Sequence, residues 1–190
     1  MKIGIFFGSF NPMHIGHKII ASYMAEFSDL GKVIFVVSPE NPLKQKKTLL
    51  DQSHRLQIIR VEVEDNLKLA VSDIEFSMPQ PSYTIDTLAR LKEDYPENEY
   101  ALIMGADNLQ NFHKWKNYEQ ILENHSIYVY PRPGIEINRT HQNIHIIDGV
   151  PQIEISASFI RNSIKEGKEV SSLIPKKAWR YINEMNFYKK

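Results

Sequence analysis

The chain has 190 residues, of which 42% are hydrophobic, enough apolar material for one well-buried domain rather than two. Its 23 basic and 23 acidic residues cancel, so no overall field would gather nucleic acid or an anionic membrane, and we expect neither as a partner. The absence of cysteine excludes disulfides, thiolate catalysis and thiolate metal ligands, and the cytoplasm is the expected compartment.

Six short segments rich in β-branched and aromatic residues are predicted to form strands. They lie at 3–7, 33–37, 67–71, 100–104, 126–130 and 143–147. The longest wholly apolar stretch, Val33 to Val37, is far shorter than the roughly 20 residues of a membrane-spanning helix. We therefore expect strands and no segment that crosses a bilayer.

Helices are predicted between these strands because apolar residues recur at helical spacing over 15–27 and 54–63. A third helix is expected after Ser82 as its N-cap, and a fourth has Pro175 in its first turn. This alternation predicts a doubly wound α/β fold with a parallel sheet and helices on both faces. We expect one domain over residues 1–190, with a C-terminal helical segment at 157–190.

Ligands bind such sheets beyond the carboxyl ends of the strands, so the loops after Phe7, Val37 and Met104 are the expected location of the site. The first of these loops reads GSFNPMHIGH and opens a helix, where free N–H groups and a positive dipole end suit a phosphate. His14 and His17 lie three residues apart, so two imidazole donors would point towards one anion. A lone histidine is more commonly packed or solvated, but this pair favours a phosphate site.

Two further positions suit a nucleotide. Ser156 and Ser158, followed by Arg161 in a first helical turn, would bring hydroxyl, N–H and guanidinium donors together, although an exposed arginine on a capped turn is an equal alternative. Asp107 follows Gly105 at the end of a predicted strand and would accept a hydrogen bond from a ribose hydroxyl, with helix capping as the alternative.

The loop at 8–17 is similar to the T/HxGH signature of the nucleotidyltransferase superfamily, and the chain resembles the bacterial nicotinate-nucleotide adenylyltransferases from its first strand to its last residues. The segments that carry the resemblance are 8–17, 39–44, 82–88, 105–109 with Trp115, 132–134 and 155–161. Two positions depart from the family pattern: Leu43 replaces a usual histidine, and Ser158 replaces a usual threonine.

The resemblance implies a Rossmann-like nucleotidyltransferase fold and direct, in-line transfer of AMP from ATP to nicotinate mononucleotide, without a covalent intermediate. The products would be nicotinate adenine dinucleotide, a precursor in NAD biosynthesis, and pyrophosphate. Mg²⁺ would be carried by the ATP phosphates and not by a protein metal site.

The resemblance also assigns site residues. The catalytic residues would be His14, His17, Lys44 and Arg161. The ATP-binding residues would be Gly8, Ser9, Phe10, Gly16, Gly105, Asp107, Ser156, Ser158 and Ile160. The residues that bind nicotinate mononucleotide would be Ser82, Tyr83, Thr84 and Trp115.

Other hypotheses explain parts of the pattern. Pantetheine-phosphate adenylyltransferases are small enzymes with the same phosphate loop, but the segment at 82–84 and Trp115 favour a pyridine substrate. A class I aminoacyl-tRNA synthetase would need an RNA-binding appendage, for which the chain has no room. A non-enzymatic nucleotide-binding module explains the fold but gives the two histidines and Arg161 no role. The assembly state is left open, with a homo-oligomer among the alternatives.

Overall fold

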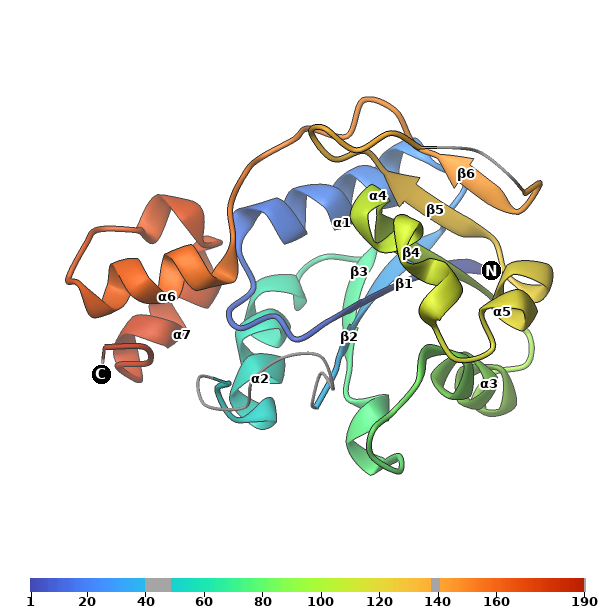
Figure 1. Ribbon diagram of the computed structural model, residues 1–190. Helices are drawn as coiled ribbons and strands as arrows, with labels where there is room; N and C mark the ends of the chain where they lie inside the picture. The colour runs from blue at the N-terminus through green and yellow to red at the C-terminus, as the bar shows by residue number, and fades with distance from the viewer. Residues whose placement is uncertain (40–48, 138–140, 190) are drawn as a thin grey trace.

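The computed structural model describes residues 1–39, 49–137 and 141–189, and its centre is a six-stranded, wholly parallel sheet (Figure 1). The strand order is β3-β2-β1-β4-β5-β6. The strands are β1 (Lys2–Gly8), β2 (Lys32–Val37), β3 (Leu69–Ser72), β4 (Glu99–Gly105), β5 (Ile127–Tyr130) and β6 (Ile144–Ile146). The predicted strands are therefore confirmed within a few residues; Leu67 is excluded from β3 and is 94% exposed.

The α-helices are α1 (Ile15–Phe27), α2 (Gln52–Val63), α3 (Thr84–Asp94), α4 (Ala106–Gln110), α5 (Tyr118–Asn124), α6 (Ala157–Lys165) and α7 (Lys176–Glu184). Short 3₁₀ turns are η2 (Ile74–Ser77), η3 (Phe112–Lys114) and η4 (Ser171–Leu173). The predicted caps need correction: Tyr83, not Ser82, precedes α3, and Pro175 is the N-cap of α7 rather than a first-turn residue. In the described part of the chain, no helix has the length and apolar character to cross a membrane.

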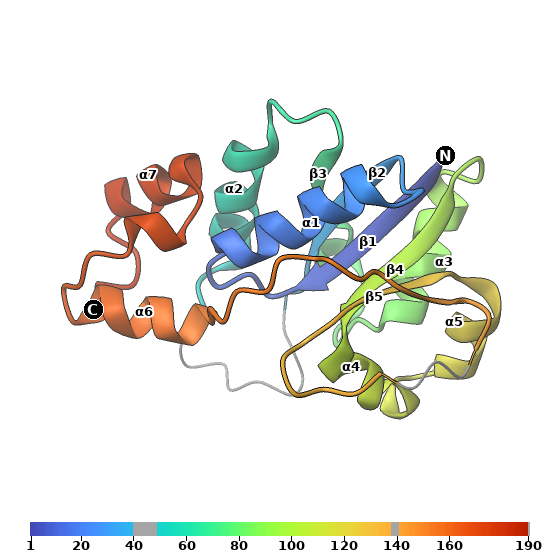
Figure 2. The same ribbon diagram turned by 90° about the horizontal axis from the view of Figure 1, so that it is seen from above.

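Both faces of the sheet are buried because the central strands are almost wholly apolar and their successive side chains point to opposite faces. In β4, Ala101 and Ile103 join the core under α1 and α2, whereas Leu102 and Met104 join the core under α3 and α5. Figures 1 and 2 show these helix pairs on opposite sides of the sheet. The doubly wound α/β prediction is therefore confirmed.

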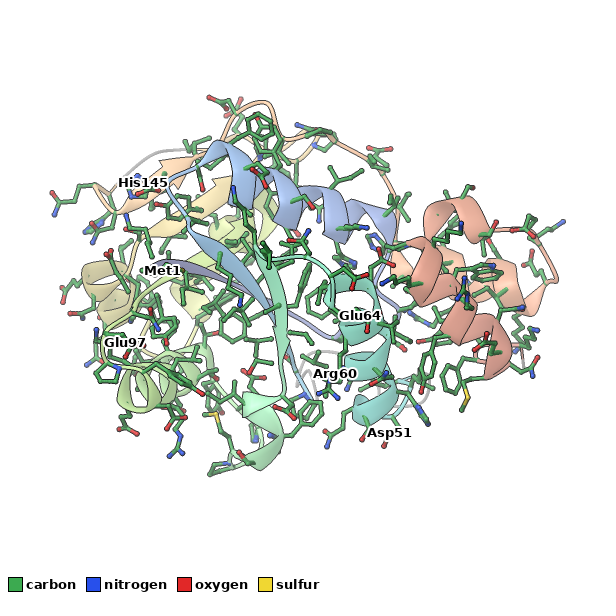
Figure 3. All side chains as sticks on the ribbon, turned by 180° about the vertical axis from the view of Figure 1, so that it is seen from behind. Met1, Asp51, Arg60, Glu64, Glu97 and His145 are labelled. Atoms are coloured by element: carbon green, nitrogen blue, oxygen red, sulfur yellow. The ribbon has the colours of Figure 1, made fainter. Side chains whose placement is uncertain are left out.

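Helix α2 has an acidic N-cap residue and a basic residue in its last turn, both of which suit the helix dipole. The Asp51 carboxylate is the N-cap and accepts a hydrogen bond from the Ser53 N–H at 2.8 Å, which lowers the pKa of Asp51. Arg60 lies in the last turn, near the negative end of the helix, and Glu64 follows as the C-cap (Figure 3). This helix carries a buried arginine that is central to the site described below.

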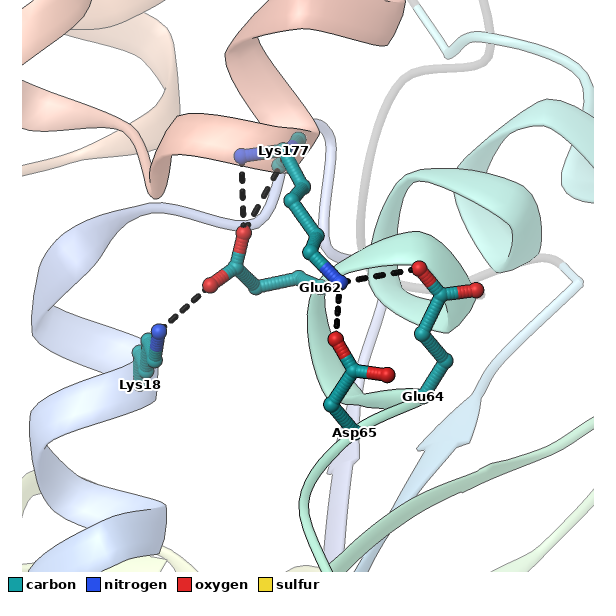
Figure 4. A network of polar contacts seen from close by, with 6 residues as sticks. Lys18, Glu62, Glu64, Asp65 and Lys177 are labelled. Atoms are coloured by element: carbon teal, nitrogen blue, oxygen red, sulfur yellow. Dashed lines mark hydrogen bonds and ion pairs between the residues drawn. The ribbon is translucent and has the colours of Figure 1, made fainter.

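The C-terminal helices pack beside α1 and α2 (Figure 2). The carboxylate of Glu62 at the end of α2 accepts hydrogen bonds from the backbone N–H groups of Lys177 (3.0 Å) and Ala178 (3.4 Å) in the first turn of α7. It also forms an ion pair with Lys18 of α1 (Figure 4). Pro175 offers no side-chain acceptor, so Glu62 supplies the missing cap and joins three helices.

The strand order reverses between β1 and β4, which pair in parallel with Phe6 opposite Ile103. Their carboxyl ends, Gly8 and Gly105, therefore lie side by side at the topological switch point. The chain leaves these ends towards α1 and α4. This juxtaposition brings two of the predicted nucleotide-binding segments to one place.

Candidate active site

The two histidines of the first loop stack on each other at the start of α1. His14 is the N-cap residue and His17 lies three residues into the helix; their ring centroids are 3.6 Å apart, with a 26° angle between the planes. The backbone N–H of His14 donates to Nδ1 of His17 at 3.2 Å. Because that Nδ1 is an acceptor, Nε2 carries the proton in the neutral form of the His17 ring.

His14 is a neutral group at pH 7. Its side chain is 7% exposed, and burial, together with the nearby charge of Arg132, lowers the pKa of His14 from 6.5 to about 4. Its buried Nδ1 has no hydrogen-bond partner among the described residues. Of the two imidazoles predicted to face an anion, the His14 ring is therefore uncharged at pH 7, and its Nδ1 has no hydrogen bond in the described chain.

The two glycines of this loop lie close to aromatic side chains. A Cβ on Gly8 would lie 2.8 Å from the ring of Phe10, and one on Gly16 would lie 3.2 Å from the His14 ring. The Phe10 side chain, expected at the ATP site, is buried in the core and packs edge-on against His17 at 5.1 Å. Only the Phe10 backbone, held at φ 44°, can therefore face a ligand, and its ring supports His17.

Arg161 reaches the same loop from α6. Its Nη1 donates to the carbonyl oxygen of Asn11 at 2.6 Å, and its Nη2 donates to Ser158 Oγ at 3.1 Å. The Asn11 side-chain oxygen also accepts hydrogen bonds from the Leu50 N–H (3.2 Å) and the Tyr188 hydroxyl (2.9 Å). Burial raises the pKa of Tyr188, so this hydroxyl remains a donor. The loop is therefore held by residues from three distant parts of the chain.

The expected helix start at residues 156–161 is partly corrected. Ser156 is the N-cap of α6 and accepts the Phe159 N–H at 3.1 Å. Arg161 is the fifth helical residue, so it lies in the second turn and not the first. Ile160 is fully buried, and only its backbone can contact a nucleotide. Lys44 and Leu43 lie outside the residues that the structure describes.

The most buried charged group near the site, Arg55 of α2, was missed by the sequence analysis. Its side chain is 0% exposed and donates to four carbonyl oxygens: Leu50 (2.8 Å), Ser9 (2.6 Å), Ser38 (2.8 Å) and Pro39 (2.9 Å). Arginine is rarely buried, so the pattern of α2 gave no signal for this role. Arg55 joins the carboxyl ends of β1 and β2 beneath the loop.

At the end of β4, Gly105 is the N-cap of α4 and Asp107 lies in its first turn. The capping alternative for Asp107 is wrong, because no side-chain hydrogen bond caps this helix. Asp107 instead pairs with Arg132 (3.5 Å from Oδ1 to Nε), whose guanidinium lies over the Tyr130 ring at 5.1 Å. A Cβ on Gly105 would lie 2.4 Å from Asp107 Oδ1, so the carboxylate needs the glycine.

The predicted pyridine-binding residues lie on neighbouring segments. Lys116 places its ammonium 4.5 Å from the centre of the Tyr83 ring and pairs with Asp86 of α3 at 2.9 Å. Lys116 thereby connects the segment that follows η3 to the start of α3, and the preceding residue, Trp115, is half-buried against Phe112. In the described chain, the N–H groups of Thr84 and Ile85 at this start have no acceptor. A cavity of about 270 Å³ between α4, η3 and α5 is lined in part by Phe112, and Tyr83, Thr84 and Trp115 are not among its lining residues.

A parallel sheet with a histidine-bearing loop at its switch point defines a nucleotidyltransferase-type α/β protein. The model of the Cytidylyltransferase-like family matches residues 5–163. A probable nicotinate-nucleotide adenylyltransferase of Flavobacterium johnsoniae is 57% identical over the full length of both chains. Another from Cytophaga hutchinsonii is 46% identical and covers 99% of this chain and 98% of its own. The chain belongs to the nicotinate-nucleotide adenylyltransferase family.

Solved structures show the same fold. A nicotinic acid mononucleotide adenylyltransferase of Plasmodium falciparum, complexed with NaAD, has a TM-score of 0.82 at 19% identity, and the match covers 98% of this chain and 97% of that chain. A putative nicotinate-nucleotide adenylyltransferase of Vibrio parahaemolyticus has a TM-score of 0.75 at 21% identity, covering 100% and 96%.

Proposed function

We propose that this protein transfers AMP from ATP to nicotinate mononucleotide, forming nicotinate adenine dinucleotide and pyrophosphate. The observation that carries the proposal is the stacked histidine pair at the switch point, in a chain with full-length adenylyltransferase relatives. The phosphate of the mononucleotide is already a nucleophile at neutral pH. The protein therefore needs to align the reactants and stabilise the charge that grows on the transferred phosphoryl group.

His17 is the proposed donor to the α-phosphoryl group. Its Nδ1 accepts a hydrogen bond from the His14 N–H, so Nε2 carries the proton in the neutral form of the ring and is the atom proposed to donate to a phosphate oxygen in the transition state. His14 is proposed to orient the ATP phosphates by donating the N–H of its neutral ring to a phosphate oxygen. Arg161 adds a permanent positive charge, and Lys44 is a second proposed cation.

Mg²⁺ is proposed to enter with ATP. The described groups at the loop are imidazole, guanidinium and N–H donors, which suit anionic oxygens, whereas Mg²⁺ prefers oxygen ligands such as phosphates. It would neutralise charge on the leaving pyrophosphate. Since ATP is a substrate, the cytoplasm is the proposed compartment.

At the other end of the site, we assign the pyridine ring to Trp115 and its carboxylate to the start of α3. The N–H groups of Thr84 and Ile85 lie at the positive end of the helix, where a carboxylate gains more than a neutral amide. Ser82 and Tyr83 shape the approach to these groups. Asp107 and Gly105 are proposed to contact the ATP nucleoside.

A turnover assay tests this function. Purified protein with Mg²⁺ and ATP is expected to convert nicotinate mononucleotide to the dinucleotide, with release of pyrophosphate, and to leave phosphopantetheine unchanged. Turnover of phosphopantetheine alone would place the chain with the pantetheine-phosphate adenylyltransferases. ATP binding without turnover of either acceptor would favour the binding-module hypothesis.

A further inference from the structure

One buried carboxylate, Glu75 of η2, has no place in the function described above. Its side chain is 2% exposed, so it cannot touch a substrate. Its Oε2 accepts a hydrogen bond from the Ser82 hydroxyl at 2.9 Å, and its Oε1 accepts one from the Thr87 hydroxyl at 2.8 Å. Among the described residues it forms no ion pair, so two neutral hydroxyls are its side-chain partners.

The two partners of Glu75 lie on either side of the start of α3. Ser82 comes just before the N-cap residue Tyr83, and Thr87 lies in the first turn that follows. The Glu75 backbone takes part as well, because its carbonyl oxygen accepts a hydrogen bond from the Gln80 side chain at 2.9 Å. Glu75 thus accepts three hydrogen bonds from residues before and within the first turn of α3.

This location explains how a carboxylate is tolerated in the core. A buried anion is costly unless it is hydrogen-bonded, and a helix N-terminus offers a favourable field. The buried polar contacts also fix the orientation of the first turn, where the N–H groups of Thr84 and Ile85 donate to no acceptor in the described chain. A shift of this turn by less than an ångström would misplace both N–H donors for a ligand.

We propose that Glu75 is a positioning residue for the acceptor substrate, holding the start of α3 in the orientation that binds the nicotinate carboxylate. The inference rests on the proposed function, because it assumes that this carboxylate binds there. Glu75 acts through Ser82 and Thr87 and takes no part in the chemical step.

The test uses full-length protein and compares Michaelis constants for the two substrates. Thr87→Val removes a fully buried hydroxyl with little change of shape, and Glu75→Leu removes both hydrogen bonds. Each variant is expected to raise KM for nicotinate mononucleotide by about 10-fold or more, while KM for ATP changes by less than about 3-fold. Glu75→Gln is expected to recover most of the loss, since an amide can bond to both hydroxyls.

Leu91→Ala is the matched control, because it loosens the buried side of α3 near its C-terminal end without touching the turn. Thermal unfolding of all variants shows whether the losses of stability are comparable. Equal rises in both Michaelis constants, a similar substrate-specific rise in Leu91→Ala, or no recovery in Glu75→Gln would overturn the role. A wild-type protein without adenylyltransferase activity would instead contradict the proposed function, and the role of Glu75 with it. If Glu75→Leu does not fold, the Michaelis constants of Thr87→Val test the role of Glu75.

Discussion

Arg161 and Asn11 lie 150 residues apart in the chain, yet the guanidinium of one donates a 2.6 Å hydrogen bond to the carbonyl oxygen of the other. The bond attaches α6 directly to the loop that follows β1. Arg161 therefore has two roles in the proposed mechanism. Its charge attracts the phosphates, and one of its N–H groups holds the loop that binds them. A lysine at this position would retain the positive charge but not the hydrogen bond to the loop.

Arg161→Lys is expected to lower kcat/KM by about 10- to 150-fold, the range that corresponds to one charged hydrogen bond of about 1.5–3 kcal/mol. Steady-state kinetics with ATP as the varied substrate measures this loss. Arg180→Lys, at an exposed arginine of α7 that has no place in the proposed site, is the control and is expected to change the same constant by less than about 3-fold. An Arg161→Lys variant with the wild-type constant would contradict the dual role.

His17→Ala is expected to lower kcat by about 10² to 10³, the loss typical of one preorganised donor to a developing anion. The KM for ATP should change much less, because the interaction strengthens in the transition state. His113→Ala, at an exposed histidine of η3, is the control and should retain the wild-type kcat. A His17 variant that changes only KM would exclude a transition-state role.

The pKa of His14 predicts a pH dependence of stability. The pKa of His14 is about 4 in the folded protein and 6.5 in the unfolded chain, so between these pH values the unfolded chain binds one proton more than the folded protein. This contribution is fully present above pH 6.5 and is lost as the pH falls towards 4. Between pH 7 and pH 5 it should remove about 2 kcal/mol from the free energy of unfolding.

Urea unfolding at both pH values measures that change, and His14→Gln supplies the comparison. The variant lacks the titrating group, so its stability should depend less on pH by about the same 2 kcal/mol. Parallel pH profiles for the two proteins would show that His14 titrates normally in the folded state.

Glu62→Ala is expected to reduce the free energy of unfolding by about 1–3 kcal/mol, because it leaves the first N–H groups of α7 without their acceptor. Glu64→Ala, two residues away, removes only an exposed ion pair with Lys177 and should cost less than about 0.5 kcal/mol. Chemical denaturation compares the two variants. Equal losses would mean that the cap contributes nothing beyond surface charge.

The wild-type protein should prefer nicotinate to nicotinamide mononucleotide by roughly 10- to 150-fold in kcat/KM, because only the acid brings a full charge to the start of α3. Trp115→Ala should weaken both substrates by similar factors and leave their ratio nearly unchanged, since both rings stack alike. A ratio that collapses in this variant would assign the discrimination to the indole.

The features that could be predicted from the sequence are those that local patterns of residues determine. Short runs of β-branched and aromatic residues located the strands, and the spacing of His14 and His17 indicated a phosphate-binding loop after the first strand. Arg55 and Glu75 escaped prediction because charged residues are usually exposed, and their burial depends on partners distant in the fold, such as the Ser9 carbonyl and the Thr87 hydroxyl. The hydrogen bond from the Tyr188 hydroxyl to Asn11 in the first loop was unpredictable for the same reason, because it joins residues far apart in the sequence.

The guanidinium of Arg55 bonds to both Pro39 and Leu50, so the segment between these residues starts and finishes at one side chain. The same guanidinium also bonds to Ser9 and Ser38, which follow β1 and β2. Loss of this one side chain would leave four carbonyl oxygens without their donor. The spacing between the carboxyl ends of these two strands is thus held by a single residue of α2.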